Sequence, residues 1–234
     1  MERIVILTGA GISAESGLGT FRDVDGLWTQ YDLSEVATPE GFARNPALVH
    51  DFYNARRANA RAARPNAAHH ALARLQEQAR IDLCLVTQNV DDLHEQAGSR
   101  GVLHMHGALN GALCAACGYR WDAPDIMGPD DRCPQCHARA TRPDVVWFGE
   151  IPQHMDEIDT ALAACDLFVS IGTSGEVYPA AGFVEAARHY GARTLEINLE
   201  PSANAHAFDE QRTGPATQSV PAWVAEVLSG VSRA

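Results

Sequence analysis

The sequence predicts an α/β protein with a Rossmann-like, doubly wound parallel sheet. The first observation is a series of short apolar runs rich in β-branched residues, at 4–7, 83–86, 145–148, 167–171 and 194–197. The second is that helix-like stretches lie between several of these runs, at 70–78, 156–164 and 180–189. Continuously apolar strands that alternate with helices indicate a parallel sheet with both faces covered.

Two segments interrupt this alternation. Residues 32–73 look helical, and Pro39, Pro46 and Pro65 stand near the expected helix starts, where proline is tolerated. Residues 107–143 contain four cysteines, several Gly and Pro, and little periodicity. We therefore expect a Rossmann-like domain formed by residues 1–31, 74–106 and 144–234, a helical insert at 32–73, and a small module at 107–143.

The cysteines of the small module form two C-x2-C pairs. Cys114 and Cys117 are followed, after fifteen intervening residues, by Cys133 and Cys136. Two such pairs can place four thiolates around one ion in a closed tetrahedral zinc site, which has no open position for water. We expect a zinc-ribbon module held folded by a structural Zn²⁺. The alternative is two redox-active or unpaired C-x2-C motifs.

The composition excludes several classes of function. The chain of 234 residues has 18 basic and 30 acidic side chains, a formal net charge of −12, and every basic residue is arginine. The absence of lysine excludes a Schiff-base lysine, a phosphate-loop lysine and a lysine general base. The acidic balance argues against nucleic acid and anionic membranes as partners, because both are bound through clustered Lys and Arg.

The same features favour a cytoplasmic protein. No apolar run approaches the roughly 20 residues that span a bilayer. Only eight residues precede the first glycine motif, so we expect no signal peptide. Cysteines in metal-ligand spacing, and not in a disulfide framework, are typical of a reducing compartment. We expect a monomer.

The clearest motif follows the first predicted strand. That strand ends at Thr8 and continues into GAGISA at 9–14, a G-x-G-x-x-A turn. The glycines of such a turn allow close approach of the backbone to a pyrophosphate at a helix N-terminus. The motif predicts dinucleotide binding. The usual dehydrogenase pattern fits poorly, because no ribose-binding acid follows about 20 residues later in a second strand.

Four polar clusters follow the expected strand ends, where ligands bind in open α/β sheets. They are QNVD at 88–91, HMHG at 104–107, GTSG at 172–175 and NLEP at 198–201. Amides and small hydroxyls suit hydrogen bonds to carboxamide, ribose and phosphate groups. His106 can act as a base near neutral pH, although a lone histidine is more often structural.

Together these motifs resemble the sirtuin family of NAD-dependent protein-lysine deacylases, in the family's order and spacing over nearly the whole chain. They are GAGISAESG at 9–17, TFR at 20–22, TQNVD at 87–91, HMHG at 104–107, the four cysteines, VVWFGE at 145–150, GTSGEVYPAAGF at 172–183 and NLEP at 198–201. The likeness is greatest to class III, the bacterial CobB type.

The resemblance implies a cofactor site and a mechanism. The residues it assigns to NAD are Gly9, Ala10, Gly11, Ser13, Phe21, Arg22, Gln88, Asn89, Asp91, Gly172, Thr173, Ser174, Asn198, Leu199, Glu200 and Ala216. His106 and Asn89 would be catalytic, and Asp91 would accept from the nicotinamide carboxamide. The acyl oxygen of the substrate lysine would attack the ribose C1′ and release nicotinamide. His106 would then act as general base on a ribose hydroxyl, which leads to O-acyl-ADP-ribose.

The resemblance also implies a substrate site. A peptide would add as a strand beside 145–150 and 175–178, which tolerates many sequences. The residues that would contact it are Val145, Phe148, Gly149 and Glu150. Tyr53 and Arg56 lie three positions apart on a predicted helix, so they share a face and would bind the carboxylate of succinyl- or malonyl-lysine. Without the family, the arginines here would be interpreted as a solvated helix face.

We therefore expect an NAD-dependent desuccinylase and demalonylase that also deacetylates, with acyl-lysine proteins as partners. A protein that is mainly a deacetylase, or a mono-ADP-ribosyltransferase, is the first alternative. A dehydrogenase would need an acid/base pair that we cannot place. A non-enzymatic NAD-sensing scaffold would lack His106 or Asn89, and both are present.

Overall fold

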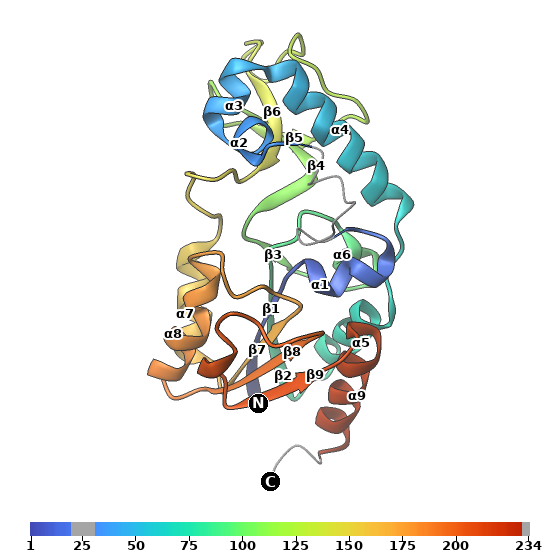
Figure 1. Cartoon of the computed structure of the whole chain (residues 1–234), viewed down its shortest axis with the longest axis vertical. Coiled ribbons are helices and arrows are strands. Elements are labelled where there is room, and N and C mark those ends of the chain that lie inside the picture. Colours follow the sequence, from blue (N-terminus) through green and yellow to red (C-terminus); the bar gives the residue numbers. More distant parts are fainter. Residues whose placement is uncertain (20–30, 231–234) are drawn as a thin grey trace.

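A parallel sheet forms the centre of the larger of two lobes (Figure 1). The computed structural model describes residues 1–19 and 31–230. Within these residues the sheet has the order β3-β2-β1-β7-β8-β9, and each neighbouring pair is parallel. Its strands are β1 (Glu2–Thr8), β2 (Ile81–Thr87), β3 (Leu103–His104), β7 (Leu167–Ile171), β8 (Arg193–Asn198) and β9 (Glu210–Thr213). The doubly wound α/β prediction is confirmed.

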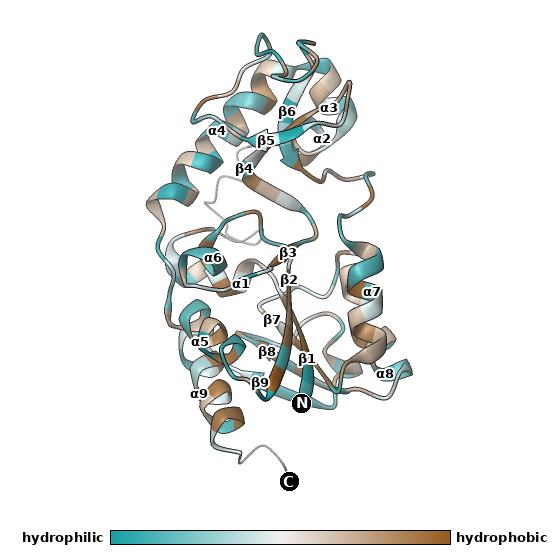
Figure 2. Cartoon of the chain, turned by 180° about the vertical axis from the view of Figure 1, so that it is seen from behind, coloured by the Kyte–Doolittle hydropathy of each residue, from teal (hydrophilic) through white to brown (hydrophobic). Residues whose placement is uncertain are grey.

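Helices cover both faces of this sheet because central strands such as β1 are apolar on both sides. Ile4 and Ile6 of β1 pack with one helix pair, whereas Val5 and Leu7 face the other pair. The first pair is α5 (Ala67–Gln76) and α9 (Ala216–Ser229), and the second is α7 (Met155–Ala164) and α8 (Phe183–His189). The hydrophobic colouring of β1 and β2 in Figure 2 reflects this burial on two sides.

The smaller lobe combines helices with a three-stranded antiparallel sheet. The helices are α2 (Leu33–Val36), α3 (Pro39–Arg44) and α4 (Pro46–Ala62), and the strands, in the order β5-β4-β6, are β4 (Gly107–Cys114), β5 (Arg120–Asp122) and β6 (Thr141–Val145). Pro39 and Pro46 occupy first-turn positions as predicted, whereas Pro65 precedes the Asn66 cap of α5. A separate apolar cluster around Phe52, Tyr53 and Trp147 joins α4 to β6.

One predicted strand is wrong. The apolar pattern places the run 145–148 in the parallel sheet, but only Val145 is in a strand, and that strand pairs with β4 in the small sheet. The chain then turns, because the Glu150 carboxylate accepts from the backbone N–H of Trp147 at 2.8 Å and Gly149 has φ +90°. Val145 and Trp147 of this run are buried in the cluster that contains Phe52 and Tyr53 of α4, and not within the large sheet. The predicted division at 73/74 falls inside α5.

Short elements complete the chain. They are α1 (Ala10–Ser13), η1 (Ala14–Ser16), α6 (Leu93–Gln96), η3 (Ala180–Gly182) and η4 (Ala205–Ala207). Several of them follow strands of the large sheet at its carboxyl edge, which places irregular backbone where a ligand can be approached. In the described part of the chain no helix has the length and apolar character needed to cross a membrane.

Candidate functional site

The turn after β1 packs directly on the turn after β7. The N–H of Gly9 donates to the Ile171 carbonyl at 3.0 Å, and that of Gly11 donates to the Gly172 carbonyl at 2.9 Å. Gly172 has φ +63°, and a Cβ on Gly11 would lie 2.7 Å from the Gly172 Cα. The backbones therefore meet at a distance that excludes side chains. In place of a long helix, only the single turn of α1 and the short η1 follow.

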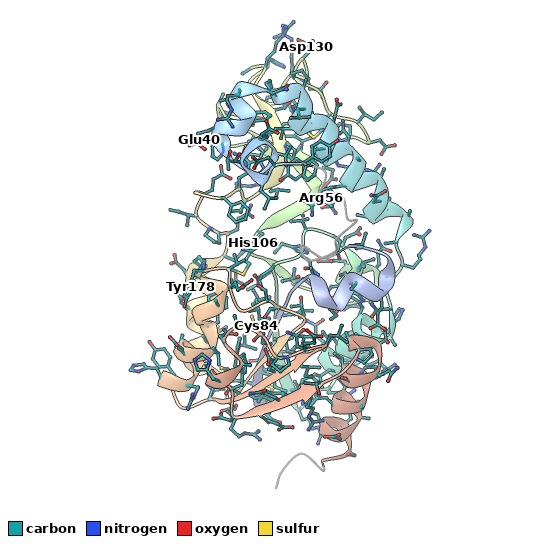
Figure 3. The ribbon with its side chains drawn as sticks, in the orientation of Figure 1. Glu40, Arg56, Cys84, His106, Asp130 and Tyr178 are labelled. Carbon is teal, nitrogen blue, oxygen red and sulfur yellow. The ribbon has the colours of Figure 1, made fainter. Side chains whose placement is uncertain are left out.

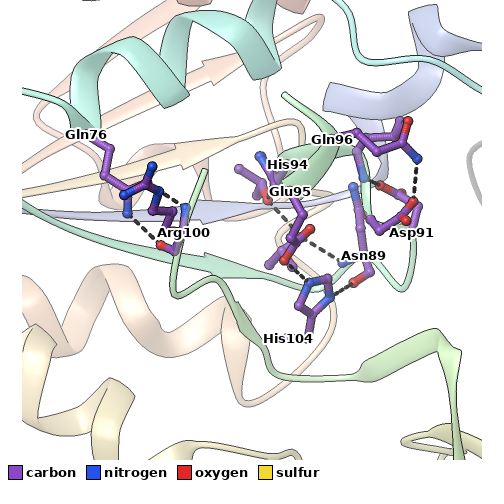
Figure 4. A network of polar contacts seen from close by, with 12 residues as sticks. Gln76, Asn89, Asp91, His94, Glu95, Gln96, Arg100 and His104 are labelled. Carbon is purple, nitrogen blue, oxygen red and sulfur yellow. Dashed lines mark hydrogen bonds and ion pairs between the residues drawn. The ribbon is translucent and has the colours of Figure 1, made fainter. Parts of the chain in front are cut away.

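Ser13, Asn89 and Asp91 form a buried polar cluster against this turn. The Asn89 amide donates to the Gly9 carbonyl and to Ser13 Oγ, both at 3.1 Å, and Ser13 Oγ donates to Asp91 Oδ2 at 3.2 Å. The other Asp91 oxygen accepts from the Leu93 N–H at 3.2 Å. Burial raises the pKa of Asp91, and these two hydrogen bonds oppose the shift. Figure 4 shows Asn89 and Asp91 on the segment after β2. Three residues predicted for the cofactor thus lie together.

His106 contacts the chain just before Asn89 through one ring nitrogen. Its Nδ1 lies 3.2 Å from the carbonyl oxygen of Gln88. Because a carbonyl only accepts, Nδ1 carries the proton in the neutral ring and Nε2 keeps its lone pair. Burial lowers the pKa of His106, and the bond to Gln88 opposes this. Figure 3 shows His106 between the two lobes, with Arg56 of α4 above it.

Two threonines support Asn89 from the sheet. Thr8 Oγ1 donates to Thr87 Oγ1 at 2.9 Å, and the Thr87 hydroxyl accepts from the Asn89 N–H at 3.0 Å. The sequence-based site did not include them. The signal was present, because each threonine directly follows a predicted apolar run, 4–7 or 83–86, and directly precedes a predicted site cluster; the two are register partners in β1 and β2.

Two buried histidines, which contact each other, connect Thr8 to Ser13. His94 Nε2 contacts Thr8 Oγ1 at 3.0 Å, and its ring lies 5.0 Å from that of His69 between centroids. His69 Nε2 lies 3.4 Å from Ser13 Oγ. Burial lowers the pKa of His69 to about 4 and that of His94 to about 3, so both rings are neutral at physiological pH. The site therefore rests on a neutral polar network, which the sequence did not predict.

A second group of predicted cofactor residues follows the carboxyl ends of β7 and β8. The Asn198 amide donates to the Thr173 carbonyl at 2.8 Å, and the Asn198 carbonyl accepts from Gly214 just before α9. Gly172, Thr173 and Ser174, the exposed Leu199 and Glu200, and Ala216 at the start of α9 complete this group of predicted cofactor residues. Phe21 and Arg22, the other two, lie outside the described residues.

Tyr53 and Arg56 share a face of α4, as their spacing predicts. The Tyr53 ring is 1 % exposed, and the Arg56 Cζ lies 5.6 Å from its centroid. Burial lowers the pKa of Arg56, whereas Tyr53 and Asp91 favour its charged form. The electrostatic influence of Asp91 links this pair to the cluster after β2.

The segment 145–150 is held firmly. Glu150 pairs with Arg142, with oxygen–nitrogen distances of 2.6 and 2.8 Å, and the N–H groups of Val146 and Phe148 donate to the carbonyls of His106 and Ala37, both at 2.9 Å. Val145 is buried, whereas the Phe148 side chain is 53 % exposed. Glu150 therefore has a partner within the protein, and Phe148 is the apolar group this segment presents outward.

The four cysteines converge as predicted. Their Sγ atoms all lie within 4.8 Å of one another, with 3.6 Å between Cys114 and Cys136 and 3.7 Å between Cys117 and Cys133. Zinc–sulfur bonds of about 2.3 Å in a tetrahedron separate sulfur atoms by about 3.8 Å. The four thiolates therefore fit one structural zinc ion, and with four protein ligands it would have no position for a substrate.

The fold and the site define an α/β dinucleotide-binding protein with a separate four-thiolate metal module. A sequence profile of the Sir2 family matches residues 9–179, and the chain belongs to this family. The resemblance to sirtuins inferred from the motifs is thereby confirmed.

The relatives agree with this assignment. The chain is 63 % identical over 232 residues to a protein of Caulobacter vibrioides, covering 97 % of each, and 55 % identical over 229 residues to one of Pasteurella multocida, covering 97 % and 98 %. Both relatives are named NAD-dependent protein deacylase. Among solved structures, a Sir2 homolog–NAD complex superposes with a TM-score of 0.89 at 38 % identity, over 98 % of this chain and 91 % of that one.

Proposed function

We propose that this protein is an NAD-dependent protein-lysine deacylase. The observation that carries the proposal is the contact of the His106 ring with the carbonyl of Gln88, the residue before Asn89, next to the buried cluster that Ser13, Asn89 and Asp91 form at the carboxyl edge of the sheet. Its relatives' shared name, and the NAD bound to the similar Sir2 homolog, support the same activity. We place it in the cytoplasm, where the four thiols stay reduced.

The site residues have separate roles in binding NAD and in proton transfer. NAD supplies an electrophilic ribose carbon and nicotinamide as leaving group, and the acyl group ends on ADP-ribose. The hydroxyl of Ser13, the amide of Asn89 and the carboxylate of Asp91 would bind the nicotinamide end of NAD. The Gly9–Ser13 turn and Asn198 would contact the rest of the dinucleotide. His106 Nε2 takes the proton of a ribose hydroxyl, which a positioned base accelerates by roughly 10²- to 10⁴-fold. The cysteine module takes no part in this chemistry.

The proposed acyl group carries a carboxylate. Arg56 offers two parallel N–H donors on a permanent charge, and Tyr53 beside it offers a hydroxyl. A charge-assisted hydrogen bond of this kind corresponds to roughly a 10- to 100-fold preference. The enzyme therefore removes succinyl and malonyl groups in preference to acetyl, and also deacetylates.

The substrate chain is an acyl-lysine protein segment lying between 145–150 and 175–178. The exposed side chains of Phe148 (53 %) and Tyr178 (76 %) flank this position. Because the N–H groups of Val146, Trp147 and Phe148 already donate within the protein, an added strand bonds to other backbone groups there. Main-chain recognition makes broad peptide selectivity the expected behaviour.

The test is a panel of acetyl-, malonyl- and succinyl-lysine peptides incubated with and without NAD and followed by mass spectrometry. We expect one nicotinamide and one O-acyl-ADP-ribose for each lysine freed, and none of these products without NAD. His106→Ala should lower the rate by roughly 10²- to 10⁴-fold. ADP-ribose retained on the peptide would instead identify a mono-ADP-ribosyltransferase.

The acyl preference is tested with Arg56→Met. The ratio of kcat/KM for succinyl-lysine to that for acetyl-lysine should fall roughly 10- to 100-fold. Arg61→Met is the matched control, because Arg61 lies on the same helix, is exposed and pairs with Asp125. A ratio that survives in Arg56→Met, or falls equally in Arg61→Met, contradicts the carboxylate assignment.

A further inference from the structure

The Tyr53 hydroxyl is hydrogen-bonded both by Arg56 of the same helix and by the indole of Trp147 in the segment 145–150. Trp147 Nε1 donates to Tyr53 Oη at 2.9 Å, and the two side chains are 2 % and 1 % exposed. We infer that Trp147 is a positioning residue for acyl selectivity: its N–H fixes the Tyr53 hydroxyl so that the phenol proton is presented to the substrate carboxylate. This inference rests on the proposed carboxylate-bearing substrate.

The hydrogen-bond chemistry of the two groups sets the direction. An indole N–H can only donate, so the Tyr53 oxygen must accept from it. The phenol O–H then points away from the indole and is available to a further acceptor. Burial raises the pKa of Tyr53, which keeps the hydroxyl protonated as a donor. A carboxylate held by Arg56 is an acceptor of the kind this proton requires.

Contacts on its ring and backbone hold Trp147 in place, and they therefore fix the direction of its indole N–H. The Arg142 Cζ lies 3.4 Å from the centroid of the indole ring, and the Phe42 ring packs on it at 5.2 Å between centroids. Glu150 accepts from both Arg142 and the Trp147 backbone N–H. The segment 145–150, beside which the peptide would bind, therefore sets the direction of the Tyr53 hydroxyl on α4. The hydrogen bond from Trp147 to Tyr53 joins this segment to the helix that contacts the acyl group.

The test removes the N–H and measures the ratio of kcat/KM for succinyl-lysine to that for acetyl-lysine. In Trp147→Phe we expect this ratio to fall about tenfold, as for one hydrogen bond to a charged group. The loss should appear as a higher KM for the succinyl peptide, because the carboxylate is bound alike in ground and transition states. Trp121→Phe, in the small sheet, is the control and should leave the ratio as in the wild type. An equal loss for both acyl groups would indicate packing alone and overturn the inference.

Two further measurements keep the outcome decisive. If Trp147→Phe does not fold, replacement of Trp147 by benzothienylalanine removes the N–H and keeps the ring shape, and the same fall is expected. In a Tyr53→Phe background, Trp147→Phe should lower the ratio no further, whereas additive losses would overturn the inference. Arg56→Met separates the two proposals. If it abolishes the preference and Trp147→Phe does not change it, only this inference fails; if the preference survives Arg56→Met, the carboxylate assignment fails.

Discussion

The imidazole Nδ1 of His106 lies 3.2 Å from the carbonyl oxygen of Gln88, the residue that directly follows β2. This contact leaves Nε2 as the basic nitrogen, and burial lowers the pKa of the ring from its ordinary value near 6.5. The base is active when unprotonated. We therefore predict that kcat/KM falls on the acid side only below about pH 6.5.

The measurement is a pH profile of kcat/KM with an acetyl-lysine peptide, because a succinyl group itself titrates in the acid range. The profile for kcat/KM reports the free enzyme, in which the contact with Gln88 is already present. An acid limb with its midpoint above pH 6.5 would mean that a different group, or a different tautomer of His106, is the base.

The buried pair His69 and His94 makes folding stability depend on pH. Their pKa values fall to about 4 and about 3 in the folded protein, whereas an unfolded histidine binds its proton near pH 6.5. Between these values the unfolded chain holds more protons, so the free energy of unfolding falls as pH falls from about 6.5 to 4. We expect a loss on the order of a few kcal/mol, measured by denaturant unfolding at a series of pH values.

His94→Gln tests this assignment, since an amide can still donate to Thr8 but does not titrate. The variant should show a shallower dependence of stability on pH than the wild type. His189→Gln is the control, because His189 is exposed at the end of α8, away from the buried pair. The same slope in His94→Gln and in the wild type would show that other groups cause the acid loss.

The parallel sheet could be predicted because its information is local. The run 167–171 is mostly apolar, the run 194–197 carries Leu195 and Ile197 on one face, and the strands there match both runs closely. The run 145–148 has the same composition but lies elsewhere. What decides its place is the ion pair of Arg142 with Glu150 and the packing of Trp147 on α4, and neither is visible in an apolar pattern.

The residues of the candidate site also fall into those that local sequence predicts and those that it does not. Cys114 and its three partners, and the glycines of the first turn, have fixed spacings that follow from local geometry. His94, Thr8 and Trp147 act through partners 86, 79 and 94 positions away in sequence. Such contacts depend on which strands become neighbours, so residue type alone does not separate these side chains from ordinary core residues.

The four-cysteine module predicts the effect of metal removal. Wild-type protein should contain one zinc per chain, and Cys136→Ser should lower zinc affinity by more than about 100-fold, since even residues outside the ligand shell contribute 10- to 100-fold. Because Arg57 of α4 donates to the carbonyl of Leu109 in β4 at 2.7 Å, loss of the module should also disturb α4. Metal analysis and thermal unfolding measure both effects. Cys84→Ser is the control and should retain zinc, since Cys84 lies in β2 outside the cluster.

The contact between the first turn and Gly172 predicts a specific loss of cofactor binding. Gly172→Ala places a side chain in a left-handed conformation (φ +63°), with its Cβ 2.6 Å from the Ile12 nitrogen, so the two turns must separate. Gly191 has φ +87° with nothing within 4 Å of its Cβ, so Gly191→Ala carries the conformational cost alone, about 1–2 kcal/mol of stability. Both variants should therefore be destabilised, but only Gly172→Ala should raise the KM for NAD, by about tenfold or more, because a displacement of about 1 Å in a binding group costs that much or more. Equal KM values for NAD in the two variants, measured by nicotinamide release, would show that the close approach of the turns does not shape the cofactor site.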